Sequence, residues 1–166
     1  MCAEDGDDAV RSTLGSMGIA AMTQHEAKVI STWEYQAPYD FYNAPADEHD
    51  LAELLDPAQR AGRYFSVHAT GELIGFVQLR SDGDAVVVGL GLRPDLTGRG
   101  LGQSFLEASL AFARGQFAPA RFRLSVATFN ERAIKVYERA GFVVTRSFMH
   151  ETNGGRFPFV EMERPA

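Results

Sequence analysis

Hydrophobic positions change their spacing several times along the chain, and these changes mark the expected helices and strands. A short apolar stretch at 16–22 predicts a first strand. Thr23 and Glu26 then match a capping box, in which each side chain satisfies a free backbone donor, so a helix is expected at 24–33. A second short helix is expected at 47–55. The first third of the chain therefore combines one strand with two helices.

From Arg63 onward, alternating and β-branched residues predict strands, separated by turn residues. Six strands are expected here, at 64–69, 73–80, 85–92, 121–127, 142–150 and 156–163. The first three form an antiparallel meander because only short turns separate them, and the last two form a hairpin across Asn153-Gly-Gly155.

Two more helices lie between these strands. The segment 101–117 carries a wide apolar face that includes Leu101, Phe105, Ala108 and Phe112, and it should pack on the sheet. A helix at 131–140 ends at Gly141, a plausible C-cap. Only the strands flanking helix 101–117 need a parallel crossover. The fold class is therefore α/β, with a mixed, mostly antiparallel sheet flanked by about four helices.

Composition adds limits on the class of protein. The 166 residues are 45% hydrophobic and 23% charged, which is typical of one folded domain. Residues 1–15 are acidic and without periodicity, so we expect a disordered leader there and a single domain at 16–166. The formal net charge of −6 has the wrong sign for holding nucleic-acid phosphates.

Membrane and export functions are not expected either. The longest apolar run, 85–92, is far short of the ~20 residues of a membrane helix. The acidic start does not match a signal peptide, and the single cysteine, Cys2, can close no internal disulfide. A cytoplasmic location is therefore expected.

The segment 90–102 carries the most specific pattern. A buried strand stops at Pro94, passes through a glycine-rich turn and opens a helix. Glycines at 98, 100 and 102 would let backbone N–H groups approach an anion at the helix start. The turn fits neither the P-loop nor the dinucleotide-binding glycine pattern. It indicates a phosphate or pyrophosphate site, or else a tight turn that merely needs glycine.

This turn and the later segment Asn130-Glu-Arg-Ala-Ile-Lys-Val-Tyr-Glu-Arg-Ala-Gly-Phe142 together resemble the GNAT superfamily of N-acetyltransferases. The resemblance implies a sheet whose central parallel strands splay apart, with acetyl-coenzyme A as co-substrate and without a metal. It implies that backbone at Leu90, Gly91 and Leu92 holds the acetyl and pantetheine parts. The pyrophosphate cradle would comprise Gly98, Arg99, Gly100, Leu101, Gly102 and Gln103. Asn130 would contact the pantetheine, although an N-cap role is equally compatible.

Tyr137 lies seven residues after Asn130, where many family members keep a tyrosine that protonates the leaving thiolate. A phenol with a pKa near 10 can return a proton to a thiolate whose conjugate acid has a pKa of about 8.5. Periodicity alone instead favours a core aromatic on the face formed with Ala133 and Ala140.

The chain departs from the family pattern at two positions. Thr97 replaces a Gln or Arg of the loop, and Ser125 replaces a glutamate that serves as base in some members. A base or water relay is needed, because an alkylamine with a pKa near 10 arrives protonated. The candidates by elimination are Glu34, Asp40, His68, His150 and Glu151, although the residue types favour a surface or core polar role for each of them over a catalytic one.

An aromatic segment at 33–43 precedes the second helix and forms neither a clean helix nor a clean strand. Its position in the family layout makes it an acceptor-binding candidate. Trp33, Tyr35, Tyr39 and Tyr42 could box a cationic amine, with Glu34 or Asp40 supplying charge. The alternative is a hydrophobic lid packed on the core.

The expected function is direct transfer of an acetyl group from acetyl-coenzyme A to a primary amine of a small molecule or peptide. Direct transfer is preferred because Cys2 is the only thiol and no nucleophile motif is present. The alternatives are a non-catalytic acyl-coenzyme A-binding module and a protein that uses the same turn for another nucleotide. The resemblance also makes a homodimer plausible.

Overall fold

The computed structural model describes residues 16–166, so the expected leader and Cys2 lie outside the described residues. One seven-stranded sheet has the order β1-β2-β3-β4-β5-β7-β6. Its strands are β1 (Gly18–Ala21), β2 (Tyr64–Ala69), β3 (Glu72–Asp82), β4 (Ala85–Leu92), β5 (Arg121–Ala127), β6 (Val143–Thr152) and β7 (Gly155–Pro165). All strand positions were predicted from the sequence to within a few residues.

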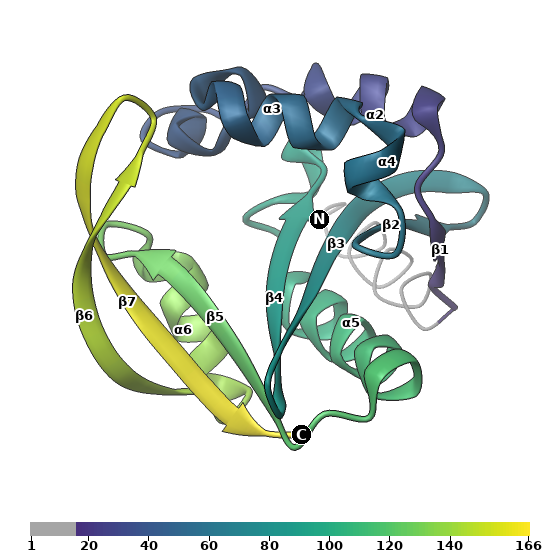
Figure 1. Cartoon of the computed structure of the whole chain (residues 1–166). Helices are drawn as coiled ribbons and strands as arrows, with labels where there is room; N and C mark the ends of the chain where they lie inside the picture. Colours follow the sequence, from purple (N-terminus) through teal and green to yellow (C-terminus); the bar gives the residue numbers. More distant parts are fainter. Residues whose placement is uncertain (1–15) are drawn as a thin grey trace, which may run out of the picture.

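The helices form two groups, one on each side of the sheet (Figure 1). The first group comprises α2 (Gln24–Ser31), α3 (Glu48–Leu55) and α4 (Pro57–Arg60). The second comprises α5 (Gly102–Phe117) and α6 (Glu131–Arg139). The aromatic segment contains two short 3-10 helices, η1 (Tyr39–Tyr42) and η2 (Ala44–Ala46), and a third, η3 (Pro94–Leu96), follows β4.

Local capping explains where several helices begin. The predicted capping box of α2 is present, because Thr23 Oγ1 accepts from Glu26 N at 3.2 Å and Glu26 Oε2 accepts from Thr23 N at 3.0 Å. The one-turn helix α4 was not predicted. Asp56 ends α3 and at the same time caps α4, with Pro57 at the first helical position. The Asp-Pro pair therefore bends the chain and restarts the helix.

One strand pair is parallel and all the others are antiparallel, as the sequence predicted. β4 pairs with β5 only from Ala85↔Arg121 to Val87↔Arg123, and then the two strands diverge. β4 remains paired with β3 as far as Leu92, and β5 remains paired with β7 as far as Ala127. The divergence therefore opens the middle of the sheet and leaves its outer pairs intact (Figure 1).

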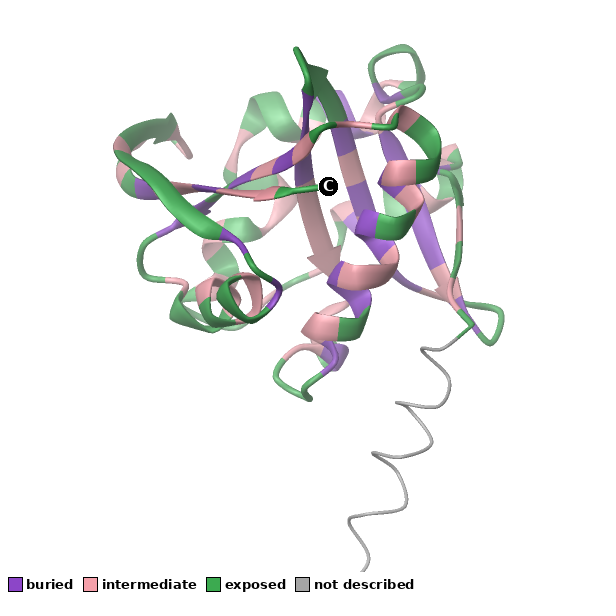
Figure 2. Ribbon diagram, turned by 90° about the horizontal axis from the view of Figure 1, so that it is seen from below, coloured by how far each residue is buried: buried purple, intermediate pink, exposed green. Residues whose placement is uncertain are grey.

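The main core lies between the sheet and α5 and α6, and buried residues follow the inner side of α5 (Figure 2). Leu101 and Phe105 are buried as expected, whereas Ala108 and Phe112 are only partly buried. Ser109 is fully buried in their place and donates to Phe105 O at 2.7 Å. A second core cluster joins α2 and α3 to β2. Among the described helices, none is both long and apolar enough to cross a membrane.

Candidate functional site

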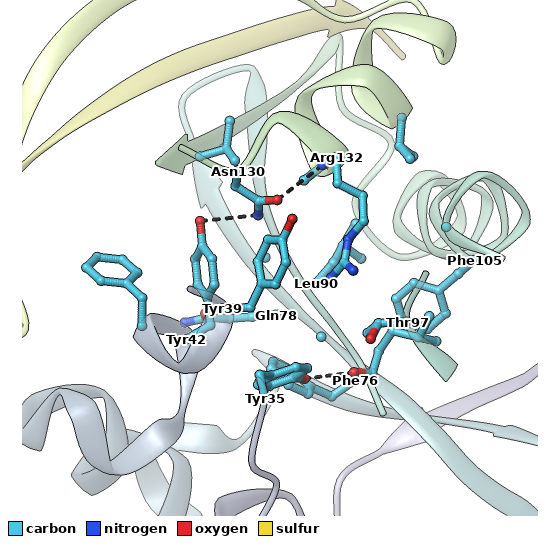
Figure 3. Close-up of a pocket in the computed structure, with 18 of the residues that line it drawn as sticks. Tyr35, Tyr39, Tyr42, Phe76, Gln78, Leu90, Thr97, Phe105, Asn130 and Arg132 are labelled. Atoms are coloured by element: carbon cyan, nitrogen blue, oxygen red, sulfur yellow. Dashed lines mark hydrogen bonds between the residues drawn. The ribbon is translucent and has the colours of Figure 1, made fainter. Parts of the chain in front are cut away.

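A cavity of about 970 Å³ occupies the divergence between β4 and β5. Its walls come from both strands, from the starts of α5 and α6, and from the aromatic segment, as Figure 3 shows. The end of the β6–β7 hairpin and the start of α3 complete one side. Segments far apart in the sequence thus meet at the place where the sheet is open.

The predicted backbone positions Leu90, Gly91 and Leu92 all line this cavity. Their neighbour β5 has moved away, so this edge of β4 has no sheet partner beyond Val87 within residues 16–166. Gly91 lies opposite Phe76 of β3, and a Cβ at Gly91 would overlap the Phe76 ring. Glycine is therefore required here by the packing of Phe76 beneath the cavity.

We expect Gly91→Ala to destabilise the protein by about 1–3 kcal/mol, the usual effect of forcing an extra methyl group into a packed site. A lower Tm by thermal unfolding would show it. Gly89→Ala is the matched control on the same strand, because its Cβ would meet the flexible Gln78 side chain at 3.2 Å. Equal Tm values for the two variants would contradict the packing argument.

The glycine-rich turn brings backbone N–H groups to the other end of the cavity. Gly98 and Gly100 have φ values of +72° and +75°, a conformation that favours glycine. Helix α5 starts immediately afterwards, and within residues 16–166 no side chain caps its first turn. Free N–H groups and the helix dipole make this a favourable place for a phosphate.

Most of the predicted cradle lines the cavity, including Gly98, Gly100, Leu101 and Gly102. Arg99 and Gln103 are not among the lining residues. Within the described chain, Gln103 Oε1 is buried without a hydrogen-bond partner. Arg132 of α6 was not predicted, but its Nη1 would lie 3.6 Å from a Cβ at Gly98 and it also lines the cavity. It adds a positive charge beside the turn.

Asn130 is the N-cap of α6, and its side chain points to Tyr42 in the cavity wall (Figure 3). Its Oδ1 accepts from Ala133 N at 3.2 Å, so the predicted N-cap is present. Its Nδ2 donates to Tyr42 Oη at 3.3 Å, and Ala127 N donates to the same oxygen at 3.4 Å. Tyr42 therefore crosses from the aromatic segment to the open edge of β5. Burial raises the pKa of Tyr42, although these two donors partly oppose the shift.

Tyr137 lines the cavity and also packs against the main core. Its ring meets Phe142 edge-on, with 5.9 Å between centroids. Burial raises the pKa of Tyr137 well above its ordinary value, and the nearby Tyr42 adds to the shift. The phenol consequently stays protonated at neutral pH and can act as a proton donor. The core packing expected from periodicity is present, and the proton-donor role of Tyr137 stays a prediction.

All four aromatic residues named as acceptor-binding candidates, Trp33, Tyr35, Tyr39 and Tyr42, line the cavity. Tyr35 Oη donates to Leu92 O at 2.7 Å, and burial raises the pKa of Tyr35 to about 12. The Arg132 guanidinium stacks on Tyr39, 4.0 Å from the ring centroid. These contacts tie the segment both to the end of β4 and to α6.

The acidic members of that segment lie elsewhere. Glu34 and Asp40 line a smaller hollow on the outer side of the segment. His68 pairs with Glu26, with 3.0 Å from Nε2 to Oε1, and exposed Glu151 lies 4.0 Å from Arg156. Of the five base candidates, only His150 lines the main cavity.

Two carboxylates that the sequence did not single out, Asp47 and Asp50, line this side of the cavity, and Glu131 of α6 lines the cavity as well. Asp47 Oδ2 accepts from Asn153 N at 2.9 Å and from Thr152 Oγ1 at 3.1 Å, while its Oδ1 accepts from Asp50 N at 3.0 Å. Hydrogen bonds, first that from Asn153 N, lower the pKa of Asp47. Asp47 thereby links the β6–β7 turn to the start of α3.

We expect Asp47→Ala to reduce stability by about 0.5–2 kcal/mol, because it removes a helix cap. The folded-state pKa of Asp47 is depressed, so its contribution is present above the unfolded value of about 3.9 and is lost as pH falls below it. Urea unfolding at pH 7 and pH 3 would test this. A difference between wild type and variant that is as large at pH 3 as at pH 7 would contradict it.

Sequence patterns alone do not place Asp50, Arg132 or Asn153 in the site. Each lies in a helix or turn that was predicted, but its position in the cavity depends on contacts between distant elements. Asn153, for example, donates from Nδ2 to Phe41 O at 2.7 Å across 112 positions. The acidic first turn of α3 was the only available signal for Asp50.

Comparison with known proteins agrees with this architecture. The acetyltransferase (GNAT) family matches residues 27–142. A mycothiol acetyltransferase of Streptomyces coelicolor is 36% identical over 110 residues, which cover 64% of this chain and 32% of that protein. One from Saccharopolyspora erythraea is 36% identical over 98 residues, 58% of this chain and 32% of its own length. The chain spans about a third of the length of these curated relatives.

Solved structures share the fold. Spermidine N-acetyltransferase from Vibrio cholerae, in complex with CoA and spermine, has a TM-score of 0.73 at 20% identity, covering 91% of this chain and 96% of that one. A GNAT-family acetyltransferase from Bacillus anthracis has a TM-score of 0.69 at 14% identity, covering 90% and 94%. The chain therefore belongs to the acetyltransferase (GNAT) family, whose members use acetyl-coenzyme A as co-substrate.

Proposed function

We propose that this protein is an N-acetyltransferase that passes the acetyl group of acetyl-coenzyme A directly to a primary amine of a small molecule or peptide. The observation that carries the proposal is the continuity of one cavity. It joins the glycine-rich turn at the start of α5, the open edge of β4, the phenol of Tyr137 and an acidic, aromatic wall.

The residues present suit the coenzyme. The turn needs positive φ values at Gly98 and Gly100 and presents an uncapped helix start, which supports binding of a pyrophosphate. The open edge of β4 offers backbone groups to an extended amide-bearing chain such as pantetheine, in the manner of an added strand. Tyr35, hydrogen-bonded to Leu92 O, holds the end of this edge in place.

The acceptor site lies at the opposite end of the cavity in this proposal. Asp47 and Asp50 are negative, and Trp33 and Tyr39 supply aromatic faces that attract cations. A cationic amine is therefore favoured over a neutral one. The named activities of the relatives on mycothiol and spermidine support an amine-bearing acceptor without choosing between the two.

Three parts of the cavity wall have distinct roles in the proposed reaction. Backbone groups of β4 position the thioester, the acidic wall orients the amine, and the hydroxyl of Tyr137 gives its proton to the departing thiolate. That hydroxyl is protonated at neutral pH, because the ordinary pKa of a phenol is near 10 and burial raises it further. One acetyl group is transferred and one free thiol is released.

Mass spectrometry provides the test. The purified protein is incubated with acetyl-coenzyme A and a panel of polyamines, amino acids, aminoglycosides, amino-sugar thiols and short peptides. We expect one acetyl group to be added to a cationic amine. Heat-inactivated protein is the control, and the absence of product despite confirmed coenzyme binding would contradict the enzymatic proposal.

A non-catalytic acyl-coenzyme A-binding module is the second candidate. Ser125 favours it, because this position on β5 carries no base and 85–92 contains no carboxylate. Such a module would bind acetyl-coenzyme A without turnover on any amine, and its behaviour would be unchanged in Tyr137→Phe.

A further inference from the structure

One imidazole faces the cavity from the β6–β7 hairpin. The chain has four histidines, all within residues 16–166, and of these only His150 lines the main cavity. His49 is largely exposed on α3, with its Nδ1 3.9 Å from Asp50 Oδ1, and His68 is paired with Glu26. His150 is therefore the one imidazole of the described residues in the cavity wall, and histidine is the side chain most often used as a general base.

Strand register places His150 on the same face of the sheet as Ser125. Ala127 of β5 lies opposite Phe159 of β7, and Phe159 lies opposite Phe148 of β6. Opposed residues share a face, and so do residues two positions apart along a strand. Ser125 and His150 are each two positions from a member of this row. His150 therefore lies on the same face of the sheet as Ser125, the β5 position that carries no base in this chain.

The residues around His150 hold its ring in place through aromatic contacts. Its centroid lies 4.8 Å from that of Phe159 and 5.9 Å from that of Phe148, both roughly edge-on. Arg146 stacks on Phe148 and donates a hydrogen bond to Glu161, so the positive charge of Arg146 is paired with a carboxylate. On the same side of the cavity, α3 contributes Asp50, which interacts electrostatically with His150. Asp47 is bound to the hairpin turn.

The two carboxylates of the wall suit a different role. Hydrogen bonds depress the pKa of Asp47, which makes it a weaker base than an ordinary aspartate. Burial raises the pKa of Asp50, and Asp47 and Glu53 raise it further. A carboxylate nevertheless remains far less basic than imidazole, so it holds an ammonium group better than it deprotonates one.

We propose that His150 is the general base that deprotonates the acceptor amine, with Asp50 holding the ammonium beside it. This inference rests on the proposed function. A nitrogen of neutral His150 takes one proton from the ammonium, and the freed amine attacks the thioester carbonyl. The C–N bond forms and the C–S bond breaks. The thiolate takes a proton from Tyr137, the second proton lost by the attacking nitrogen restores the Tyr137 hydroxyl, and one proton is finally released from the imidazolium to solvent.

The pH dependence of kcat/KM with the best amine of the panel provides the test, in wild type and His150→Gln. We expect the variant to lose about 100-fold at pH 7, the typical contribution of a positioned base. The deficit should shrink as pH approaches the acceptor's own pKa near 10, where the amine supplies its neutral form unaided. A purely structural defect would instead lower kcat/KM by a similar factor at every pH.

His49→Gln is the matched control, since it removes an imidazole beside the same aspartate without touching the cavity wall. It should keep the wild-type profile. Asp50→Asn should raise KM and preserve the dependence of kcat on pH. An unchanged rate in His150→Gln, or a deficit equal at all pH values, would overturn the assignment of His150. Failure of wild-type protein to acetylate any amine, with coenzyme binding intact, would overturn the proposed function and this inference with it.

Discussion

Gly100→Glu is expected to weaken coenzyme A binding by about 100-fold or more, or about 2.8 kcal/mol at 1.4 kcal/mol per tenfold. Gly100 adopts φ +75° in the turn that precedes α5, and a glutamate there places a negative charge among N–H groups suited to an anion. Calorimetric titration with coenzyme A, and the shift in Tm that it produces, would measure the loss.

Gly83→Glu separates this effect from backbone strain. Gly83 has φ +61° in the β3–β4 turn, and a Cβ there meets nothing within 4 Å. Both variants therefore place a non-glycine residue in the left-handed conformation, which costs free energy, and both add the same charge. Of the two positions, only Gly100 lines the cavity. Equal coenzyme affinity in the two variants would place the phosphate site elsewhere.

The sequence predicted the elements well where periodicity and capping act locally. Thr23 and Glu26 satisfy each other within one turn, and β2 was found from its apolar and β-branched residues, most of which are buried because both faces of the sheet are covered there. The helix at 101–117 was also predicted, but Ser109 was not expected inside. Its hydroxyl is satisfied by Phe105 O one turn back, so a polar residue is tolerated in the core.

The glycine-rich turn that we propose as the coenzyme end of the site was likewise predictable, because it depends on contiguous residues. Gly98 and Gly100 are two positions apart, and their backbone conformations follow from the turn itself. The acceptor end is different. It is assembled from α3, the aromatic segment and the β6–β7 turn, which meet through contacts such as that between Asp47 and Asn153. Such contacts leave no spacing pattern in the chain.

This difference explains why Glu34 and Asp40 were selected as charged partners of the aromatic segment and Asp50 was not. Adjacent residues in an irregular segment need not share a face. Tyr35 and Tyr39 turn inward, whereas Glu34 and Asp40 line the outer hollow. The negative charge beside the aromatic rings comes instead from a helix that follows.

Tyr137→Phe is expected to lower kcat by about 100-fold, the scale of losing a positioned proton donor, while coenzyme affinity is retained. The substitution removes one hydroxyl and keeps the ring that packs on Phe142. Within the described chain that hydroxyl makes no hydrogen bond to protein, so Tm should change little. Steady-state kinetics with acetyl-coenzyme A, together with thermal unfolding, would establish both points.

Tyr42→Phe is the informative companion, because Tyr42 is another phenol in the same cavity and its pKa is also raised. Its oxygen accepts from Ala127 N and Asn130 Nδ2, so its removal also frees two donors at the edge of β5. We expect it to change KM for the coenzyme more than kcat. The opposite pattern, with kcat unchanged in Tyr137→Phe and strongly reduced in Tyr42→Phe, would assign proton donation to Tyr42 and leave Tyr137 as a core aromatic. Two donors at its oxygen would then stabilise the phenolate that Tyr42 becomes on giving up its proton.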